Sequence, residues 1–320
     1  MDKSLQPAEA PPKPSTGRWA SRKIWILIGT ATAVIVIALA VGLGVGLTRT
    51  SVTDTSPPSS TLPTLDQNRT ATADIWRPAK GTSWNYSLKS AVNTTTAHGF
   101  QVWIIDLFEN DASTIVDLRT KGNNVICYFS AGSYEDWRPD STSFNEVDLG
   151  HDLDGWPGER WVNISSSQLQ EIMTKRLDLA VEKHCDGVDP DNVDAYDNDN
   201  GLQLTEADSI DYMSFLSEEA HQRGLAIGLK NAGAIIPSVI NLTEWSVNEQ
   251  CLQYDECDTY SLFIQKEKPV FHVEYPKGQD VSNNADVSES QKKEICDATS
   301  AEGFSTIMKN IDLDAWIEAC

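Results

Sequence analysis

Residues 185–192 read CDGVDPDN, and this stretch decides how the rest of the chain is interpreted. A short apolar segment ends there in a cluster of carboxylates, and Pro190 is expected to end the strand. Aspartates at the carboxyl end of a strand are typical of (β/α)8 barrel enzymes, whose active sites lie at that end of the barrel. A second strand-like segment ends in Glu249. Two carboxylates facing one cleft favour acid/base chemistry on a glycosidic bond over a solvated acidic loop.

Residues 75–320 contain eight strand-like segments, and helical patterns alternate with them. Several strands are continuous apolar runs, as expected of parallel strands buried on both faces. Alternating strands and helices predict an α/β fold, and eight units favour a closed (β/α)8 TIM barrel over an open doubly wound sheet. No Gly-x-Gly-x-x-Gly follows the first strand, which argues against a dinucleotide site. The expected strands are 83–88, 102–107, 125–130, 187–189, 225–230, 245–248, 270–274 and 305–309.

Two long amphipathic helices are expected, over residues 165–183 and 205–223. Each begins with a hydroxyl residue followed three positions later by a polar partner, a pattern typical of a capping box. The two pairs are Ser165 with Gln168 and Thr205 with Asp208. Residues 288–300 form a third, weaker helical pattern.

The part of the chain before the barrel has a different composition. Residues 24–47 are apolar and uncharged, and a membrane-spanning helix needs roughly 20 such residues. The core of a signal peptide is usually shorter, about 7–15 residues, so a retained transmembrane helix is favoured over a cleaved signal. Residues 1–23 are expected to be a polar cytosolic tail, and residues 48–74, rich in Ser, Thr and Pro, a disordered stalk.

The charges around the apolar run predict its orientation. Lys and Arg are frequent before residue 24, whereas only Arg49 follows the run closely. Because the side richer in Lys and Arg stays in the cytosol, a single-pass type II protein of the plasma membrane is expected, with residues 75–320 outside. If the apolar run were cleaved instead, the same domain would be secreted.

Signs of an extracellular, oxidising compartment follow the apolar run. All six cysteines lie there, an even number that is compatible with disulfides. Glycosylation sequons lie there too, although chance can produce them in a chain rich in Asn and Thr. The sequons are at Asn68, Asn85, Asn93, Asn163 and Asn241. The possible cysteine pairs are Cys251–Cys257, Cys296–Cys320 and Cys127–Cys185, the last of which could also be two buried thiols on neighbouring strands.

The chain is strongly acidic. It has 25 Lys and Arg against 47 Asp and Glu, which gives a formal net charge of −22 at pH 7. Phosphate groups would be repelled, so nonspecific binding of nucleic acid is not expected. A cationic substrate, such as a polymer of unacetylated amino sugars, would be attracted. Acidity that only keeps the protein soluble is the alternative explanation.

Polar and aromatic side chains gather at the carboxyl ends of the expected strands. A barrel built for stability alone has no need of a charged or hydrogen-bonding group at nearly every strand end. The aromatic rings offer flat faces on which sugars can stack, although each ring could instead pack in the core. The site candidates are Trp84, Asp106, Tyr128, Asp189, Asp191, Asn192, Lys230, Glu249 and Glu274 at strand ends, with Tyr134 in the loop after the third strand.

A metal site is the main chemical alternative. Asp189, Asp191 and Asp194 could bind a hard cation, but the spacing around Gly201 does not fit a calcium loop. There is no His-x-x-x-His and no Cys-x-x-Cys for zinc, and no Gly-x-Ser-x-Gly for a serine nucleophile. We therefore expect no metal and no other cofactor.

Five segments resemble glycoside hydrolase family 114. They are WIIDLF at 103–108, VICYFSAGSYE at 125–135, DGVDPDN at 186–192, GLKN at 228–231 and NEQC at 248–251. Members are barrel enzymes described as endo-α-1,4-polygalactosaminidases, and the membrane-anchored layout is similar to that of fungal members. The resemblance covers roughly residues 75–315, and the motifs occur in order at the expected strand ends.

The resemblance implies an endo-acting hydrolase of α-1,4-linked, galactosamine-containing polysaccharide such as galactosaminogalactan. It implies Asp189 as the nucleophile and Glu249 as the general acid/base of a retaining hydrolysis, with Asp191 as the second choice of nucleophile. Asp106, Tyr128, Lys230 and Glu274 would support the pair, and Asp106 and Glu274 would bind a sugar ammonium. A non-catalytic carbohydrate-binding barrel and a metal-dependent hydrolase are the alternatives.

Overall fold

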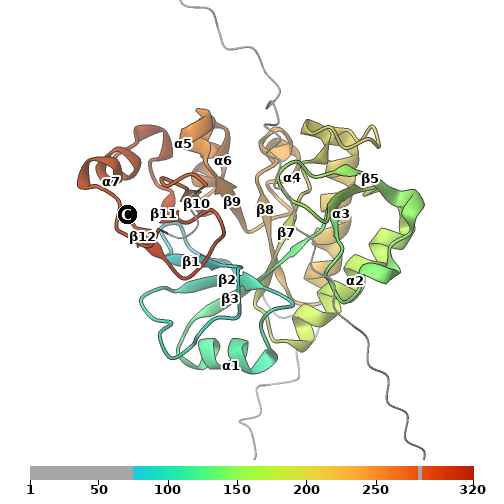
Figure 1. Ribbon diagram of the computed structural model, residues 1–320, viewed down its shortest axis with the longest axis horizontal. Helices are drawn as coiled ribbons and strands as arrows, with labels where there is room; N and C mark the ends of the chain where they lie inside the picture. The colour runs from blue at the N-terminus through green and yellow to red at the C-terminus, as the bar shows by residue number, and fades with distance from the viewer. Residues whose placement is uncertain (1–74, 280–282) are drawn as a thin grey trace, which may run out of the picture. The chain divides into compact units, whose positions relative to one another are not determined.

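Eight parallel strands, hydrogen-bonded in the order of the chain, form the main sheet (Figure 1). The computed structural model describes residues 75–279 and 283–320. Each of these strands coincides with one expected from the sequence. They are β1 (Trp84–Ser87), β2 (Val102–Asp106), β3 (Asn124–Ser130), β7 (Gly187–Asp191), β8 (Ala226–Lys230), β9 (Trp245–Glu249), β10 (Val270–Glu274) and β11 (Ser305–Lys309).

The first and last strands of this series meet. The indole N–H of Trp84 donates a hydrogen bond of 2.7 Å to the carbonyl of Ser305, and the backbone N–H of Leu88 donates one of 3.1 Å to the carbonyl of Leu313. The sheet is therefore a nearly closed α/β barrel, as the sequence predicted. A further strand that was not predicted, β12 (Ile317–Ala319), pairs antiparallel with β11.

Alternate residues of each strand face the barrel interior or the surrounding helices. The interior is a cluster rich in aromatic rings, among them Trp84, Tyr86 and Trp245, and all three are fully buried. Gly228 makes room for one of these rings, because a Cβ at this position would lie only 2.0 Å from Nε1 of Trp245. The outward faces of the strands pack against the helices in a separate, larger apolar cluster.

Helices follow most of the strands. The two long expected helices form, and their apolar stripes are buried apart from Ile210 of α3, which is half-buried, and Val181 at the end of α2, which is exposed. The α-helices are α1 (Ala112–Thr120), α2 (Ser167–Glu182), α3 (Glu206–Gln222), α4 (Ile236–Val239), α5 (Cys251–Tyr254), α6 (Ser261–Gln265) and α7 (Glu289–Cys296). Single turns of 3-10 helix span Ser141–Ser143, Glu146–Asp148, Ala195–Asp197, Gly233–Ile235, Cys257–Tyr260 and Thr299–Ala301.

Only one of the two expected capping boxes forms. At the start of α3 the Thr205 hydroxyl accepts from the Asp208 N–H, and the Asp208 carboxylate accepts from the Thr205 N–H. The box predicted from Ser165 and Gln168 is wrong. The N-cap of α2 is Ser166 instead of Ser165, and the Gln168 amide donates to the carbonyl of Ser143.

Strand β7 runs two residues further than the sequence predicted. Pro190 was expected to end it, but the strand continues to Asp191 and stays in register with β3, where Phe129 lies opposite Pro190. Proline has no N–H to donate to a ladder. β7 pairs with β8 only at Gly187 and Val188, so no hydrogen bond to β8 is expected at Pro190 and none is lost there. The strand end therefore shifts from Asp189 to Asp191.

A small antiparallel sheet interrupts the alternation between β3 and α2. It consists of β4 (Ser133–Glu135), β5 (Leu149–Asp152) and β6 (Glu159–Val162), paired in the order β4-β6-β5. The sequence analysis predicted no strands here. Because β4 begins just after the carboxyl end of β3, this sheet leaves the barrel at the end where active sites of such folds lie.

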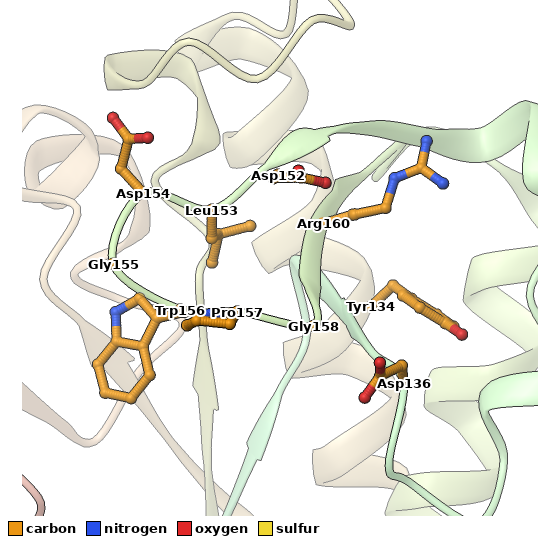
Figure 2. Close-up of a pocket in the computed structure, with 10 residues that line it drawn as sticks. All are labelled: Tyr134, Asp136, Asp152, Leu153, Asp154, Gly155, Trp156, Pro157, Gly158 and Arg160. Atoms are coloured by element: carbon orange, nitrogen blue, oxygen red, sulfur yellow. The ribbon is translucent and has the colours of Figure 1, made fainter. Parts of the chain in front are cut away.

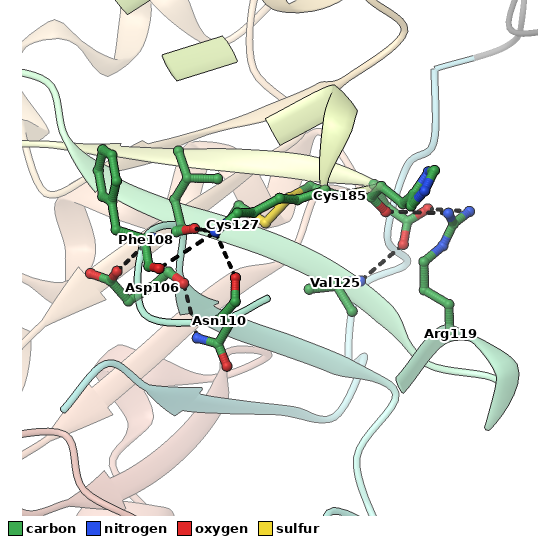
Figure 3. Close-up of a disulfide and its surroundings, with 11 residues drawn as sticks. Asp106, Phe108, Asn110, Arg119, Val125, Cys127 and Cys185 are labelled. Atoms are coloured by element: carbon green, nitrogen blue, oxygen red, sulfur yellow. Dashed lines mark hydrogen bonds and ion pairs between the residues drawn. A yellow bond between two sulfur atoms is a disulfide. The ribbon is translucent and has the colours of Figure 1, made fainter. Parts of the chain in front are cut away.

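Three disulfides join the six cysteines, in the pairs that the sequence suggested. Cys127 and Cys185 form a bridge rather than two free thiols, and it links β3 to the segment that leads into β7 (Figure 3). Beside this bridge, the Asp186 carboxylate accepts a hydrogen bond of 2.9 Å from the Val125 N–H and contacts Arg119 at 3.2 Å. The entry to β7 is thus held covalently and by charge. The other pairs are Cys251–Cys257 and Cys296–Cys320.

In residues 75–279 and 283–320, no helix combines the length and the apolar character that a bilayer-spanning segment needs. The expected cytosolic tail, transmembrane helix and stalk, in residues 1–74, lie outside the described residues, and so does the Asn68 sequon.

Candidate active site

A buried lysine holds two carboxylates together at the carboxyl ends of three neighbouring strands. Nζ of Lys230, the last residue of β8, lies 2.9 Å from Oδ2 of Asp191 on β7 and 2.5 Å from Oε2 of Glu249 on β9. Burial alone would lower the pKa of the Lys230 amine, but the two carboxylates outweigh it and raise that pKa well above its usual value. The amine is therefore charged, and it bridges the two acids.

Three donors converge on the carboxylate of Asp191. Besides Lys230, the phenol of Tyr128 donates a hydrogen bond of 2.8 Å to Oδ2, and the Asn192 backbone N–H donates one of 2.7 Å to Oδ1. Burial raises the pKa of the Tyr128 phenol well above its usual value, so the phenol keeps the proton that it donates. Charge-assisted bonds of this kind hold an ionised carboxylate in one orientation.

Glu249 is oriented from both sides. Its Oε1 accepts a hydrogen bond from the phenol of Tyr275, and its backbone N–H donates to the amide oxygen of Asn231 at 3.0 Å. Burial and the nearby Glu249 charge raise the pKa of the Tyr275 phenol, so Tyr275 is the donor of this pair. The Glu249 side chain is 21 % exposed, against 12 % for Asp191, so Glu249 has the better access to solvent.

The shared lysine limits the distance between the two carboxylates. Two atoms that both contact a third atom cannot be farther apart than the sum of the two distances, here 2.9 Å and 2.5 Å. Oδ2 of Asp191 and Oε2 of Glu249 therefore lie within about 5.4 Å of each other. The carboxyl groups of retaining glycosidases are about 5–5.5 Å apart, whereas inverting enzymes place them about 6.5–9.5 Å apart.

Asp189, implied by the resemblance as the nucleophile, does not reach this group. Its side chain points into the barrel two residues before the strand end and is fully buried, and neither carboxyl oxygen has a hydrogen-bond partner among the described residues. Burial raises the pKa of Asp189 well above its usual value, and the charge of Asp191 adds to the effect, so this carboxyl is neutral. Asp189 lies deeper in the barrel because β7 continues to Asp191, which is therefore the residue at the barrel mouth.

Glu274, expected to bind a sugar ammonium, faces the other side of its strand. Its Oε1 accepts hydrogen bonds of 2.8 Å from Nε2 of His272 and from the backbone N–H of Leu252, both outside the barrel interior. The next residue, Tyr275, has the opposite orientation and contacts Glu249 instead. At the end of this strand it is thus Tyr275, and not Glu274, that contacts Glu249.

Asp106, the other expected ammonium ligand, already has a cationic partner. Both of its oxygens contact the guanidinium of Arg138, at 3.0 Å and 2.7 Å. Its Oδ1 also accepts from the backbone N–H groups of Phe108 and Glu109. The carboxylate is thus used to fix the loop after β2, and it offers no free charge to a sugar.

The three remaining candidates have positions of different kinds. Trp84 is a core residue, because its ring lies in the barrel interior and its N–H is bonded to Ser305. The Asn192 side chain donates to the Ser130 hydroxyl at 2.9 Å, which places its backbone N–H against Asp191. Tyr134 lies on β4, at the edge of a separate hollow.

Two buried or partly buried acidic residues near the pair, Glu159 and Asp194, have raised pKa values. Burial raises the pKa of Glu159 on β6 to about 7, with the charges of Glu135 and Asp191 adding to the effect, although Glu159 accepts a hydrogen bond of 2.7 Å from the Ser133 hydroxyl. Burial, and next the charge of Asp191, raise the pKa of Asp194 to about 6. The sequence carried no signal for Glu159, since its strand was not expected.

The carboxylates considered as cation ligands do not gather around one point. Among the described residues, one group of Cys, His, Asp or Glu side chains is close enough to hold an ion, namely Cys251, Cys257 and His272. Its two sulfurs are bonded to each other, and Nε2 of His272 is bonded to Glu274. The ligand atoms of Asp189, Asp191 and Asp194 do not lie close enough together to form such a group.

Solved structures share this fold. A crystal structure of Ega3 from Aspergillus fumigatus in complex with galactosamine is 58 % identical in sequence, covers 77 % of this chain and 97 % of its own, and superposes with a TM-score of 0.75. The glycoside hydrolase domain of PelA from Pseudomonas aeruginosa is 11 % identical, covers 74 % of this chain and 98 % of its own, and has a TM-score of 0.59, which shows a common fold.

Sequence comparison agrees with the structural neighbours. An uncharacterized protein of Deinococcus radiodurans is 25 % identical over 219 residues, which are 61 % of this chain and 70 % of that protein. Residues 65–320, most of the chain, match the sequence profile of glycoside-hydrolase family GH114. With this match, the barrel and the paired carboxylates at its mouth, the chain belongs to glycoside-hydrolase family GH114.

Proposed function

We propose that this protein is an endo-acting glycoside hydrolase that cleaves α-1,4-linked, galactosamine-containing polysaccharide. The observation that carries the proposal is the placement of Asp191 and Glu249 on one lysine at the barrel mouth. The galactosamine bound to Ega3, a protein 58 % identical to this chain, supports the choice of sugar. The acidity of the chain suits a substrate that carries ammonium groups.

The proposed reaction is a double displacement with retention of configuration. Asp191 attacks the anomeric carbon while Glu249, in its acid form, gives its proton to the departing glycosidic oxygen, and a covalent glycosyl–Asp191 ester forms. Glu249 then takes a proton from water, and the hydroxide attacks the same carbon and releases Asp191. The separation of at most about 5.4 Å supports this scheme, because an inverting enzyme needs room for water between the two acids.

The contacts of each carboxylate suit these roles. Asp191 is the more buried of the two and is held by Lys230, Tyr128 and a backbone N–H, which keep one oxygen aimed in a fixed direction. Glu249 is the more exposed, and an acid/base residue must exchange protons with water once in each cycle. This division of roles replaces the assignment of the nucleophile to Asp189.

The proposal is tested by incubating the protein with deacetylated and acetylated α-1,4-galactosamine oligomers and identifying the products by mass. We expect internal cleavage of the deacetylated oligomers and a first-formed product with the α configuration by NMR. Asp191→Asn and Glu249→Gln should each lower kcat by about 10³-fold or more and leave binding of the polymer intact. If the wild-type protein binds the polymer but releases no products, it is a carbohydrate-binding barrel and the proposal is wrong.

The site of action proposed here is the outside of the plasma membrane. The apolar residues 24–47, and the Lys and Arg before them, support a type II anchor. Three disulfides in the described residues suit an oxidising compartment. Treatment of intact cells with a protease should release residues 75–320. If the domain becomes accessible only after the cells are lysed, the placement is wrong.

A further inference from the structure

The small β4-β6-β5 sheet contains a hollow that shares no residue with the catalytic group. Its volume is about 440 Å³ (Figure 2). We call it the β5–β6 hollow, since the turn between these strands surrounds it. Asp154 and Trp156 lie on one side of it and Tyr134, Asp136 and Arg160 on the other. It is lined by Tyr134, Asp136, Asp152, Leu153, Asp154, Gly155, Trp156, Pro157, Gly158 and Arg160.

Two exposed tryptophans stand at this hollow. Trp156 is 56 % exposed and Trp137 is 51 % exposed, whereas every other tryptophan of the described residues is buried or half-buried. Gly158 in the hollow's wall packs against Trp137, since a Cβ on Gly158 would lie 3.1 Å from Cζ3 of that ring. Two exposed indole rings beside one hollow provide flat apolar faces on which a sugar ring can stack.

The carboxylates at the hollow are free of cations. Asp136, Asp152 and Asp154 line it, and none of them forms an ion pair within the described residues. The one cationic side chain of the lining, Arg160, is directed elsewhere. Its guanidinium contacts Glu146 at 2.7 Å and the carbonyl of Gly150 at 3.1 Å. The hollow thus combines flat aromatic surface with uncompensated negative charge.

The hollow is anchored to the barrel mouth on both sides. Next to Gly158, Glu159 accepts a hydrogen bond from Ser133 at the start of β4. Next to Trp137, Arg138 binds both oxygens of Asp106 at the end of β2. Leu153 of the turn packs in a small apolar cluster with Trp161 and Ala195. A ligand in the hollow would therefore have a fixed position relative to the catalytic group.

We propose that the β5–β6 hollow is an accessory subsite that binds one amino-sugar unit of the polymer away from the cleaved bond. The C–H face of the sugar ring would stack on Trp156, and its ammonium group would pair with the carboxylates of Asp136, Asp152 and Asp154. A neutral sugar would use only the ring, and a small cation only the charge. An amino sugar matches both. This inference rests on the proposed function, because the occupant is another part of the same substrate.

The test compares long and short substrates. Trp156→Ala should raise KM for the deacetylated polymer about three- to tenfold, the loss expected for one aromatic stacking contact, with kcat unchanged. For oligomers too short to span both sites, KM should stay at the wild-type value. Asp154→Asn should also raise KM for the deacetylated polymer, and should leave KM for an acetylated polymer unchanged. Two variants of exposed residues outside the hollow serve as controls. Val147→Ala, between β4 and β5, controls for the loss of an exposed apolar group, and Glu302→Gln, before β11, controls for the loss of a charge.

The outcomes separate this inference from the proposed function. If Trp156→Ala leaves KM for the polymer unchanged, or raises it equally for short oligomers, the accessory subsite is wrong although the enzyme still cleaves. If the wild-type protein cleaves nothing, the proposed function fails. Binding of immobilised deacetylated polymer by the wild type and by Trp156→Ala then still tests the hollow, and equal binding overturns it. Thermal unfolding of each variant verifies that the fold is intact.

Discussion

At the scale of single residues, Lys230 gives the site its geometry. It is buried and charged between Asp191 and Glu249, and such an arrangement is tolerated only because each charge has a partner. The lysine holds Oδ2 of Asp191 and Oε2 of Glu249 within about 5.4 Å of each other and, with Tyr128, fixes the direction of the Asp191 oxygen. Removal of Lys230 would leave two neighbouring carboxylates without their shared cation.

The two neighbouring aspartates of β7 should differ sharply in importance. Asp189 is buried and neutral, so Asp189→Asn replaces one uncharged group by another of the same shape, and we expect kcat to fall by less than about threefold. Asp191→Asn removes the proposed nucleophile and should lower kcat by about 10³-fold or more. Steady-state kinetics with matched unfolding curves measures both. A properly folded Asp189→Asn variant as inactive as Asp191→Asn would contradict the assignment.

Glu159 should make stability depend on pH. Its pKa is raised from 4.5 in the unfolded chain to about 7 in the folded protein, so the folded state holds the proton more tightly. The resulting stabilisation is complete below about pH 4.5 and is lost as the pH rises through about 7. It amounts to about 3 kcal/mol at most. Urea unfolding at pH 5 and pH 8 should show this loss in the wild type but not in Glu159→Gln. If the free energy of unfolding falls equally between pH 5 and pH 8 in the two proteins, another group is responsible.

At the scale of secondary-structure elements, the direction of each side chain follows from where its strand ends. Successive residues of a strand point to opposite faces, so a strand that ends one residue later presents a different side chain to the mouth. β10 illustrates this, because Glu274 faces the helices and Tyr275 faces Glu249. In β7 the two extra residues preserve the orientation but move the mouth from Asp189 to Asp191.

The capping box of α3 offers a measure of local stability. The Thr205 hydroxyl accepts from the Asp208 N–H and anchors the first turn of a helix that packs on the barrel. Thr205→Ala should lower the free energy of unfolding by about 1 kcal/mol. Thr205→Ser keeps the hydroxyl and should stay within about 0.5 kcal/mol of the wild type. Chemical denaturation provides the comparison, and an equal loss in both variants would mean that the threonine methyl, not the cap, is responsible.

At the scale of the whole molecule, the disulfides differ in the length of chain that they enclose. Cys127 and Cys185 are 58 residues apart, whereas Cys251 and Cys257 are 6 apart. In the chain-entropy account, the stabilisation is about 4 kcal/mol for the long loop and about 2 kcal/mol for the short one. Replacement of Cys127 and Cys185 by Ala should therefore lower Tm more than replacement of Cys251 and Cys257. Differential scanning calorimetry tests the order, and the reverse order would contradict it.

The net charge of the molecule should make activity sensitive to salt. A protein of formal charge −22 attracts a cationic polymer over distances that salt screens. We expect KM for the deacetylated polymer to rise severalfold between about 0.05 M and 0.5 M NaCl, with kcat nearly constant. For an acetylated, neutral polymer KM should not change. A KM for the cationic polymer that is independent of salt would rule out long-range attraction.

The amino-acid sequence by itself determined the series of eight parallel strands, and it suggested the three cysteine pairs while leaving Cys127 and Cys185 as either a bridge or two thiols. Continuous apolar runs such as 125–130 are local patterns, and they form strands because the barrel buries both of their faces. The motifs at the strand ends also sufficed to recognise the family. These features depend on short stretches of chain, so they can be predicted even where the exact first and last residues of a strand cannot.

Only the tertiary structure showed that Asp191, and not Asp189, lies beside Glu249 at the barrel mouth. Pro190 reads as a strand breaker, but β7 continues past it, because β3 pairs with this part of the strand and β8 does not. Arg138 forms an ion pair with Asp106, and Lys230 forms ion pairs with Asp191 and Glu249. The partners are more than 15 positions apart in the chain, so no local sequence pattern reveals these contacts. The β4-β6-β5 sheet likewise exists only through pairing of short strands that have no strong local pattern. Which oxygen meets which donor is set by the closure of the barrel, a property of all its strands together.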